Sequence, residues 1–442
     1  MLSELLLVLA SSPLIITLAY YTAILSAALK HSARDPTREG GCSLEVVIPV
    51  KGEPVGVVAR TARRAAEALR GGCALGVTVL SDDSPDRVEE LRRALDQGVR
   101  VLHRAEPRGG RTGALDEFFF SHARADYVLV LDADALLSDD AARELCRRAD
   151  GRTVLILPWR AYFDHRTRVA EAMKFATDLG SAILYLARSR AGLYTFPLGS
   201  GTAFPVRVVR EVNGWGPGVI QDDIHIGVKL ALAGYETEVL ESAFVEVLVP
   251  SRLSSLRKQQ RRWAYGASEV LSRSLIPLLK ARVTPLARRL EMIVYMAQPL
   301  FTAPLAAAFA IAPLAAVAEP ASTLVGVALA TSSLLTAYLL LYGRLFAKKL
   351  EKGDIVNLGR LAAIFTVLSP VLAVSALRGL ARAPMAFEVT PKGEKERLAG
   401  KDPLPFVEAA YAAATALLAL HTGNSAALLV SSALLAASIY AA

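Results

Sequence analysis

The sequence has little cysteine, and its cysteines are not spaced as metal ligands. The chain has 442 residues and three cysteines, Cys42, Cys73 and Cys146, scattered along it. Their spacing fits no zinc or iron–sulfur motif. An odd number of scattered cysteines predicts reduced, unpaired thiols, as is usual in a cytoplasmic domain.

Charged residues are missing from several long stretches, although they make up 21% of the chain. Three uncharged runs, 5–29, 292–317 and 321–343, are each long enough to cross about 30 Å of hydrocarbon as a helix. Two shorter apolar runs, 406–420 and 426–442, predict a closing helical hairpin that turns at residues 421–424. The mean hydropathy of +0.37 agrees with a membrane protein.

Two further absences narrow the class of protein. The first apolar run lacks a basic segment before it and a clear cleavage site after it, so it predicts an uncleaved anchor and not a signal peptide. The net charge of +8 comes with no basic face interleaved with aromatic residues, which argues against nucleic-acid binding. Basic clusters instead flank the apolar runs, as the positive-inside rule leads one to expect.

Residues 31–253 have the character of a soluble domain. Predicted strands alternate with predicted helices, 57–70 and 87–97 among them, every 10–15 residues. The predicted strands are residues 44–50, 76–80, 100–103, 128–131 and 154–158. This alternation is typical of βαβ units and predicts an α/β domain with a mostly parallel sheet.

The most informative stretch is the apolar run 128–131, which is followed at once by Asp132 and Asp134. Ligands of open α/β sheets bind at the carboxyl ends of strands. Side chains two apart on an extended segment point the same way, so these carboxylates can hold one hard divalent cation against phosphate oxygens. Without partners elsewhere in the chain, however, Asp-x-Asp is also an ordinary turn.

The partners follow in a fixed order along the chain. Pro49 and Glu53 close the first strand, Asp82 and Asp83 follow the second, and Gly110–Asp116 opens a helix after a glycine-rich turn. Later motifs are Gly199-Ser200-Gly201, Gln221-Asp222-Asp223, Gln259-Gln-Arg-Arg-Trp263 and Phe387-Glu-Val-Thr-Pro-Lys392. This order resembles the family 2 membrane glycosyltransferases, and in particular the cellulose synthase and hyaluronan synthase group.

The resemblance implies a GT-A fold, which is a Rossmann-like sheet that binds a nucleoside-diphosphate sugar, UDP- or GDP-linked. It implies Mg²⁺ or Mn²⁺ on Asp134 with Asp132, and Asp223, beside Asp222, as catalytic base. The implied nucleotide-sugar contacts are Pro49, Glu53, Asp82, Asp83, Arg111, Asp132, Gln259, Arg262, Thr390 and Lys392. The implied acceptor contacts are Gly199, Ser200, Gly201 and Trp263, where glycine lets the backbone approach a sugar closely.

Three positions depart from the family pattern. Arg111 stands where the family usually has Lys, and it keeps a cation for phosphate. Asp116 replaces the usual Asn, and His225 replaces a usual acidic residue, so neither is given a role by the resemblance. For Asp222 and Asp223 a plainer interpretation is also open, because acidic residues suit the positive N-terminal end of a helix.

These observations predict four parts: an N-terminal transmembrane helix (1–30), a GT-A domain (31–253), amphipathic interface helices with the Gln-x-x-Arg-Trp motif (254–290) and a transmembrane bundle (291–442) that includes a gating loop (383–398). We expect an integral, multi-pass plasma-membrane protein with a cytoplasmic catalytic domain. For the gating loop to be cytoplasmic, the apolar segment 361–377 must not cross. Its central Ser-Pro predicts a re-entrant or interfacial segment with a broken backbone, and hence five spans.

The predicted reaction is a single inverting displacement, in which the base takes the proton of an acceptor hydroxyl. The leading hypothesis is a processive synthase that secretes a polysaccharide. The alternative is a single transfer to a membrane lipid, as in enzymes like ceramide glucosyltransferase. The small number of spans favours this alternative or a homo-oligomer. A third hypothesis, a transporter with a regulatory nucleotide-binding domain, is disfavoured because the apolar runs carry almost no internal charge.

Overall fold

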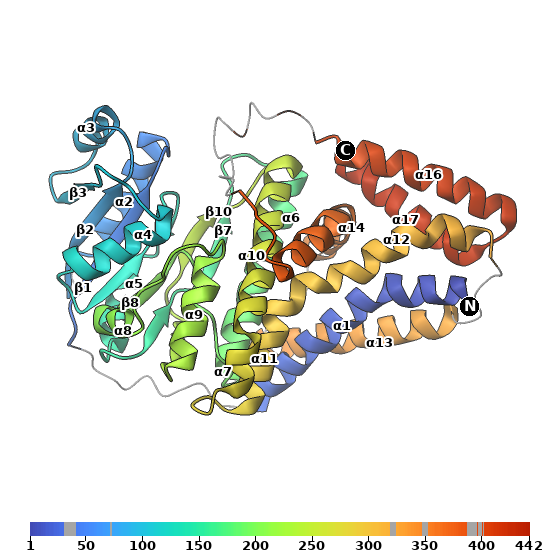
Figure 1. Ribbon diagram of the computed structural model, residues 1–442, viewed down its shortest axis with the longest axis horizontal. Helices are drawn as coiled ribbons and strands as arrows, with labels where there is room; N and C mark the ends of the chain where they lie inside the picture. Colours follow the sequence, from blue (N-terminus) through green and yellow to red (C-terminus); the bar gives the residue numbers. More distant parts are fainter. Residues whose placement is uncertain are drawn as a thin grey trace.

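The computed structural model describes residues 1–30, 41–70, 73–318, 324–346, 352–386, 396, 400 and 402–442. Figure 1 shows the strands gathered at one end of the molecule and the long apolar helices at the other. The amino terminus lies at the far end of the helices, so helix α1 (Leu2–Lys30) runs from there toward the sheet domain.

The main sheet has seven strands in the order β3-β2-β1-β4-β8-β6-β9, and it is mostly parallel as predicted. Only β8 runs antiparallel to its neighbours, β4 and β6. The strands are β1 (Leu44–Val50), β2 (Ala74–Ser81), β3 (Val99–His103), β4 (Tyr127–Val130), β6 (Val154–Ile156), β8 (Thr202–Pro205) and β9 (Thr237–Val239). Residues of β1 and β4 are buried on both faces, which is why these strands read as continuous apolar runs.

Helices cover both faces of this sheet and form two separate cores. One core joins β1 and β4 to α2 (Val55–Ala68) and α5 (Ala141–Arg148). The other contains residues of α4 (Gly110–Glu117), η1 (Phe118–His122), α8 (Val206–Glu211) and α9 (Asp222–Leu232). Helix α3 (Pro85–Ala94) lies beside α2. A small second sheet, β5 (Leu136–Leu137), β10 (Val245–Leu248) and β7 (Trp159–Tyr162), completes the domain.

A middle layer connects the sheet domain to the apolar helices (Figure 1). Its members are α6 (Arg168–Gly180), the π-helix η2 (Ser181–Ala187), α7 (Arg188–Arg190), α10 (Leu253–Lys280), α11 (Leu286–Ala297) and η3 (Gln298–Phe301). Helix α10 carries the Gln-x-x-Arg-Trp motif and packs against both α9 and α14 (Lys352–Leu380). The motif therefore lies on the helix that links the catalytic sheet to the apolar region.

Among the described residues, four helices are long and apolar enough to cross a membrane: Leu2–Lys30, Leu286–Ala316, Gly353–Leu380 and Leu404–Thr422. The second of these ends with α12 (Thr302–Ala316), and the fourth is α16. Helices α13 (Leu324–Phe346) and α17 (Ser425–Ala441) lie in the same apolar region. The predicted closing hairpin is confirmed. Gly423 takes a left-handed conformation at φ +71°, and the Asn424 side chain accepts from Ala427 N to cap α17.

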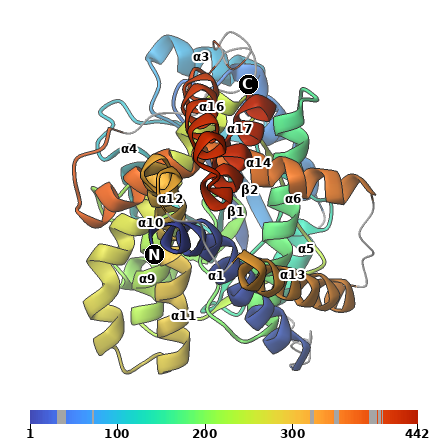
Figure 2. The ribbon, with the colours of Figure 1, turned by 90° about the vertical axis from the view of Figure 1, so that its right-hand side faces the viewer.

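The prediction of a broken backbone at 361–377 is wrong, because this segment lies within the unbroken helix α14. Pro370 has no N–H to offer the carbonyl four residues earlier, that of Thr366. The Ser369 hydroxyl donates to that carbonyl at 2.8 Å and replaces the missing bond. Figure 1 shows α14 nearly end-on and Figure 2, turned by 90°, shows it lengthwise, so it runs across the direction of α1 and α12.

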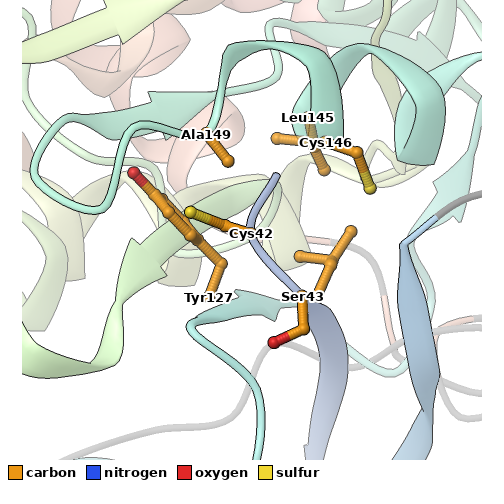
Figure 3. A pocket seen from close by; sticks show the side chains of 7 residues that line it. Cys42, Ser43, Tyr127, Leu145, Cys146 and Ala149 are labelled. Carbon is orange, nitrogen blue, oxygen red and sulfur yellow. The ribbon is translucent and has the colours of Figure 1, made fainter. Parts of the chain in front are cut away.

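The prediction of unpaired thiols is also wrong. Cys73 and Cys146 form a disulfide, with their Cα atoms 6.0 Å apart and a separation of 73 positions in sequence. Cys73 precedes β2 and Cys146 lies on α5, and both pack at the edge of the same core. Cys42 stays a free thiol beside them and lines a small pocket with Tyr127 and Cys146 (Figure 3). This pocket lies at the amino ends of β1 and β4, opposite the predicted site.

Candidate active site

The two aspartates after β4 lie at the carboxyl edge of the sheet but in different surroundings. The segment forms a turn in which Ala135 N donates to Asp132 O at 3.1 Å, so it is not extended as predicted. The Asp132 side chain is 45% exposed, whereas Asp134 is buried at 5%. Asp132 therefore faces the open part of the site, whereas Asp134 is enclosed by the protein.

Arg111, at the start of α4, joins three of the predicted site residues. Its guanidinium bonds to Asp222, to Asp132 at 3.2 Å and to the carbonyl of Gly199. Burial alone would lower the pKa of Arg111, but the carboxylates of Asp222 and Asp132 outweigh it and raise that pKa. The cation predicted to bind phosphate thus lies among the predicted carboxylates.

Asp222 and Asp223 begin α9, and their environments set them apart. Asp222 is ion-paired with Arg111. Asp223 accepts from three neutral donors, Ile224 N at 2.7 Å, Gln221 Nε2 at 2.9 Å and Gly199 N at 3.1 Å. Burial and then the charge of Asp222 raise the pKa of Asp223 from 3.8 to about 6. A carboxylate with a raised pKa can act as a base near neutral pH, and Asp223 fits that role better than its neighbour.

The Gly199–Gly201 turn serves mainly to shape the fold. Ser200 is fully buried, and its hydroxyl accepts from Asp132 N at 3.0 Å. Gly201 has φ +91°, and a Cβ there would lie 2.5 Å from Val245 Cγ1, so glycine is required by packing. Both residues are buried inside the domain, and their contact with a sugar stays a prediction. Gly199 is partly exposed beside Asp223, and for it acceptor contact stays a prediction.

The predicted nucleotide contacts near β1 and β2 form two groups. Asp83 accepts from Gly52 N at 2.6 Å, and Glu53 accepts from Lys51 N at 2.5 Å, so these carboxylates order the turn after Pro49. Asp82 is instead held by Arg104, whose Nη1 lies 2.8 Å from one carboxylate oxygen. Both side chains of that pair are about 5% exposed or less, so the pair supports the strand ends from inside.

Arg262 and Trp263 of the Gln-x-x-Arg-Trp motif lie on α10, near the same carboxyl edge of the sheet. Burial lowers the pKa of Arg262, and the charges of Asp132, Asp222 and Asp223 oppose that effect, which places Arg262 in their field. The Trp263 ring lies 6.3 Å from that of Trp159, and Trp159 donates to Ser200 O. A Cβ at Gly266 would lie 2.6 Å from Gln221 Cβ, so α10 packs directly on the turn before Asp222.

The predicted gating residues Thr390 and Lys392 lie outside the described residues. The described residues on either side of this segment form hydrogen bonds with α10 or with the residues just before it. Tyr265 donates to Ala383 O at 2.7 Å, and Glu396 accepts from Ser251 N at 2.9 Å and Ser251 Oγ at 2.8 Å. Ser251 and Tyr265 bracket Gln259–Trp263 along the chain.

Asp116 and three unpredicted residues complete the surroundings of the site. Asp116 accepts from Trp215 N at 2.7 Å and Gly216 N at 3.0 Å, which explains a carboxylate where the family usually has an amide. The sequence did not predict Arg104, Trp159 and Tyr185 as part of the site. Each shows its position only through contacts with residues distant in sequence.

A divalent cation fits the residues present. Asp132 and Asp134 offer hard carboxylate oxygens, and the bond from Arg111 to Asp132 shows a position that attracts a cation. Within the described ranges no group of three or more His, Cys, Asp or Glu side chains gathers as a metal site. Two protein carboxylates with the remaining ligands from phosphate and water is the usual arrangement for Mg²⁺.

Comparison with known proteins finds similarity to glycosyltransferases. Residues 127–346 match the family described as "Glycosyl transferase family group 2". A "Probable glycosyltransferase" of Sulfolobus acidocaldarius is 27% identical over 371 residues, which cover 79% of this chain and 77% of that protein. A poly-beta-1,6-N-acetyl-D-glucosamine synthase of Staphylococcus aureus is 26% identical over 215 residues, and the match covers 48% of this chain and about half (52%) of the synthase.

A solved structure is similar over most of the chain. It is the mannosyltransferase PcManGT from Pyrobaculum calidifontis in complex with GDP-Man and Mn2+. The TM-score is 0.63, the sequence identity is 19%, and the match covers 87% of this chain and all of that one. At this identity the likeness establishes a shared fold.

Proposed function

Because residues 127–346 match the family described as "Glycosyl transferase family group 2", we propose that the chain transfers a sugar from a nucleoside-diphosphate sugar to an acceptor hydroxyl at a membrane. The observation that carries the proposal is the arrangement of Asp132, Arg111 and Asp223 at one sheet edge. The first two suit a diphosphate, and the third is a base with a raised pKa. A UDP- or GDP-sugar is the proposed donor, and the GDP-Man bound by the similar mannosyltransferase makes GDP-mannose the first to test.

Each residue is given one task in the proposed reaction. Arg111 and Arg262 donate to the diphosphate oxygens of the bound donor. Asp132 and Asp134 hold Mg²⁺ or Mn²⁺, which when bound neutralises charge on the leaving diphosphate. Asp223 accepts the proton of the acceptor hydroxyl as its oxygen bonds to the anomeric carbon and the bond to the diphosphate breaks. One displacement of this kind inverts the anomeric configuration.

The acceptor has two candidates. A growing polysaccharide is the leading one, and the similarity to a poly-beta-1,6-N-acetyl-D-glucosamine synthase supports it. Trp263, with Trp159 beside it, supplies flat apolar surfaces for sugar rings. This proposal includes processive synthesis coupled to secretion and a gating loop, residues 383–398, over the donor. It also includes a multi-pass location in the plasma membrane with a cytoplasmic catalytic domain.

A membrane lipid is the second candidate, and the small number of candidate spans favours it. Four helices among the described residues are long and apolar enough to cross a membrane. A polymer secreted by so few helices would need a path that a homo-oligomer supplies between its copies.

The test uses membranes that contain the full chain and a panel of radiolabelled UDP- and GDP-sugars. Transfer from at least one donor is expected with the wild type and not with Asp223→Asn. Product size then separates the two acceptors, since a polymer elutes early in gel filtration and a glycolipid moves into organic solvent. If no donor releases its diphosphate or transfers its sugar, the proposed function is wrong.

A further inference from the structure

Three elements that are distant in sequence meet at one buried carboxylate near the site. Glu291 of α11 accepts from Arg188 Nη2 at 2.7 Å and from the hydroxyl of Tyr20, on α1, at 2.5 Å. Arg188 is fully buried and also donates to Tyr194 O at 2.8 Å. Removing one partner of a buried ion pair leaves an uncompensated charge, so this group is sensitive to change. We call Tyr20, Arg188 and Glu291 the α1 junction.

Tyr295, one helical turn beyond Glu291, extends the α1 junction toward the site. The guanidinium carbon of Arg188 lies 4.2 Å from the centre of the Tyr295 ring, within cation–π range. The same ring stacks on Phe196, with centroids 5.0 Å apart and 27° between the planes. The hydroxyls of Tyr185 and Tyr295 share a hydrogen bond. Both side chains are partly exposed.

Phe196 links this group to α9, the helix that begins at Asp222 and carries Asp223 in its first turn. Tyr194 donates to the carbonyl of Gly227 on α9 at 2.9 Å. A Cβ at Gly227 would lie 2.8 Å from Phe196 Cδ1, so α9 is pressed against the segment that ends at Gly199.

We propose that the α1 junction positions the acceptor side of the active site, with Tyr185 and Tyr295 as its wall, so that α1 takes part in catalysis and is more than an anchor. Tyr20, Arg188 and Glu291 act through Tyr295 and Phe196 and touch no substrate. The two phenols face an acceptor that carries hydroxyl groups, which they can bond or stack on. The donor is held on the other side, by Arg111 and Asp132, so the junction governs acceptor use and leaves donor binding unchanged. This inference rests on the proposed transfer reaction.

The test compares two neighbouring tyrosines of α1 in the full-length protein. Tyr20→Phe removes one hydroxyl from the α1 junction. Tyr21→Phe is the matched control, because the Tyr21 hydroxyl lies 3.4 Å from Gln298 Oε1, too long for a strong hydrogen bond. Membranes with each variant are assayed for sugar transfer to their endogenous acceptor at saturating donor. The KM of the donor and the affinity for its nucleoside diphosphate with Mn²⁺ are measured alongside.

For Tyr20→Phe we expect transfer to fall about fivefold or more, since a hydrogen bond to a charged group is lost. Donor KM and nucleotide affinity should stay within about twofold, and Tyr21→Phe should match the wild type. Glu291→Gln keeps an oxygen for Tyr20 but leaves Arg188 unpaired, and should lose more transfer with the same donor KM. A Tyr20→Phe enzyme that transfers like Tyr21→Phe, or one that loses transfer and nucleotide binding together, overturns the inference. Absence of transfer by the wild type with every donor would instead refute the proposed function.

Discussion

The pH dependence of transfer tests the assignment of Asp223 most directly. A base works in its ionised form, so activity is expected above the pKa of Asp223, about 6, and is lost below it. On the acid side, kcat/KM should fall about tenfold per pH unit, because it follows the fraction of free enzyme with an ionised base. An unperturbed aspartate, with a pKa of about 3.9, would keep the enzyme fully active to about pH 5.

The size of the effect follows from the surroundings of Asp223. Replacement by Asn keeps the shape and removes the proton acceptor, which should cost about 10²–10⁴ in kcat, or about 3–5 kcal/mol. Nucleotide affinity should hold, because Asp223 takes its hydrogen bonds from Gly199, Gln221 and Ile224 and not from the donor side.

Asp222→Asn provides the matched comparison. The Asp222 charge raises the pKa of Asp223, and Arg111 lowers it. The Asp222→Asn change removes the Asp222 charge and frees Arg111 from its ion pair, and both effects lower the pKa of Asp223. The fall of activity on the acid side of the pH profile should therefore move to lower pH, and transfer should be retained. The assay is initial-rate release of nucleoside diphosphate in membranes between about pH 5 and pH 8, the range that spans the expected midpoint. If Asp222→Asn abolishes transfer while Asp223→Asn keeps most of it, the base has been assigned to the wrong residue.

Four further outcomes are expected. Excess chelator should abolish transfer and Mg²⁺ or Mn²⁺ restore it, whereas full activity in chelator would remove the metal from the proposal. Cys73→Ser should lower stability to denaturant by up to about 4 kcal/mol, because the disulfide closes a long loop in the unfolded chain; an unchanged midpoint would show that the bond is not formed in solution. Gly201→Ala should lower the free energy of unfolding by about 1–3 kcal/mol or more, because the added Cβ meets Val245 and φ is positive at this position. Thermal unfolding measures the effect, and Gly199→Ala is the milder control. Asn424→Ala should lower the free energy of unfolding by about 1–2 kcal/mol, because the cap of α17 and the bonds to Ser3 and Ala315 are lost together. An unchanged thermal unfolding temperature would show that the cap does not stabilise the protein.

Several features of this protein were determined by the sequence alone. A buried strand followed by Asp132 and Asp134 indicates a sheet edge, because the strand and the turn residues are local signals. The position of Asp223 at a helix start and the hairpin at Gly423 are local in the same sense, and the structure has both elements. The mostly parallel sheet followed from the alternation of strands and helices along the chain.

Other features were decided only by the tertiary structure, because they depend on partners far apart in the chain. The disulfide joins residues 73 positions apart, and the Tyr20–Glu291 bond spans 271. Ser369 keeps α14 continuous at Pro370 by bonding one carbonyl, where Ser-Pro alone predicted a break. The burial of Ser200 and the close packing of Gly201 on Val245 also depend on segments distant in sequence. A sequence specifies residue types and spacing, whereas burial and the choice of partner are set when distant segments pack together.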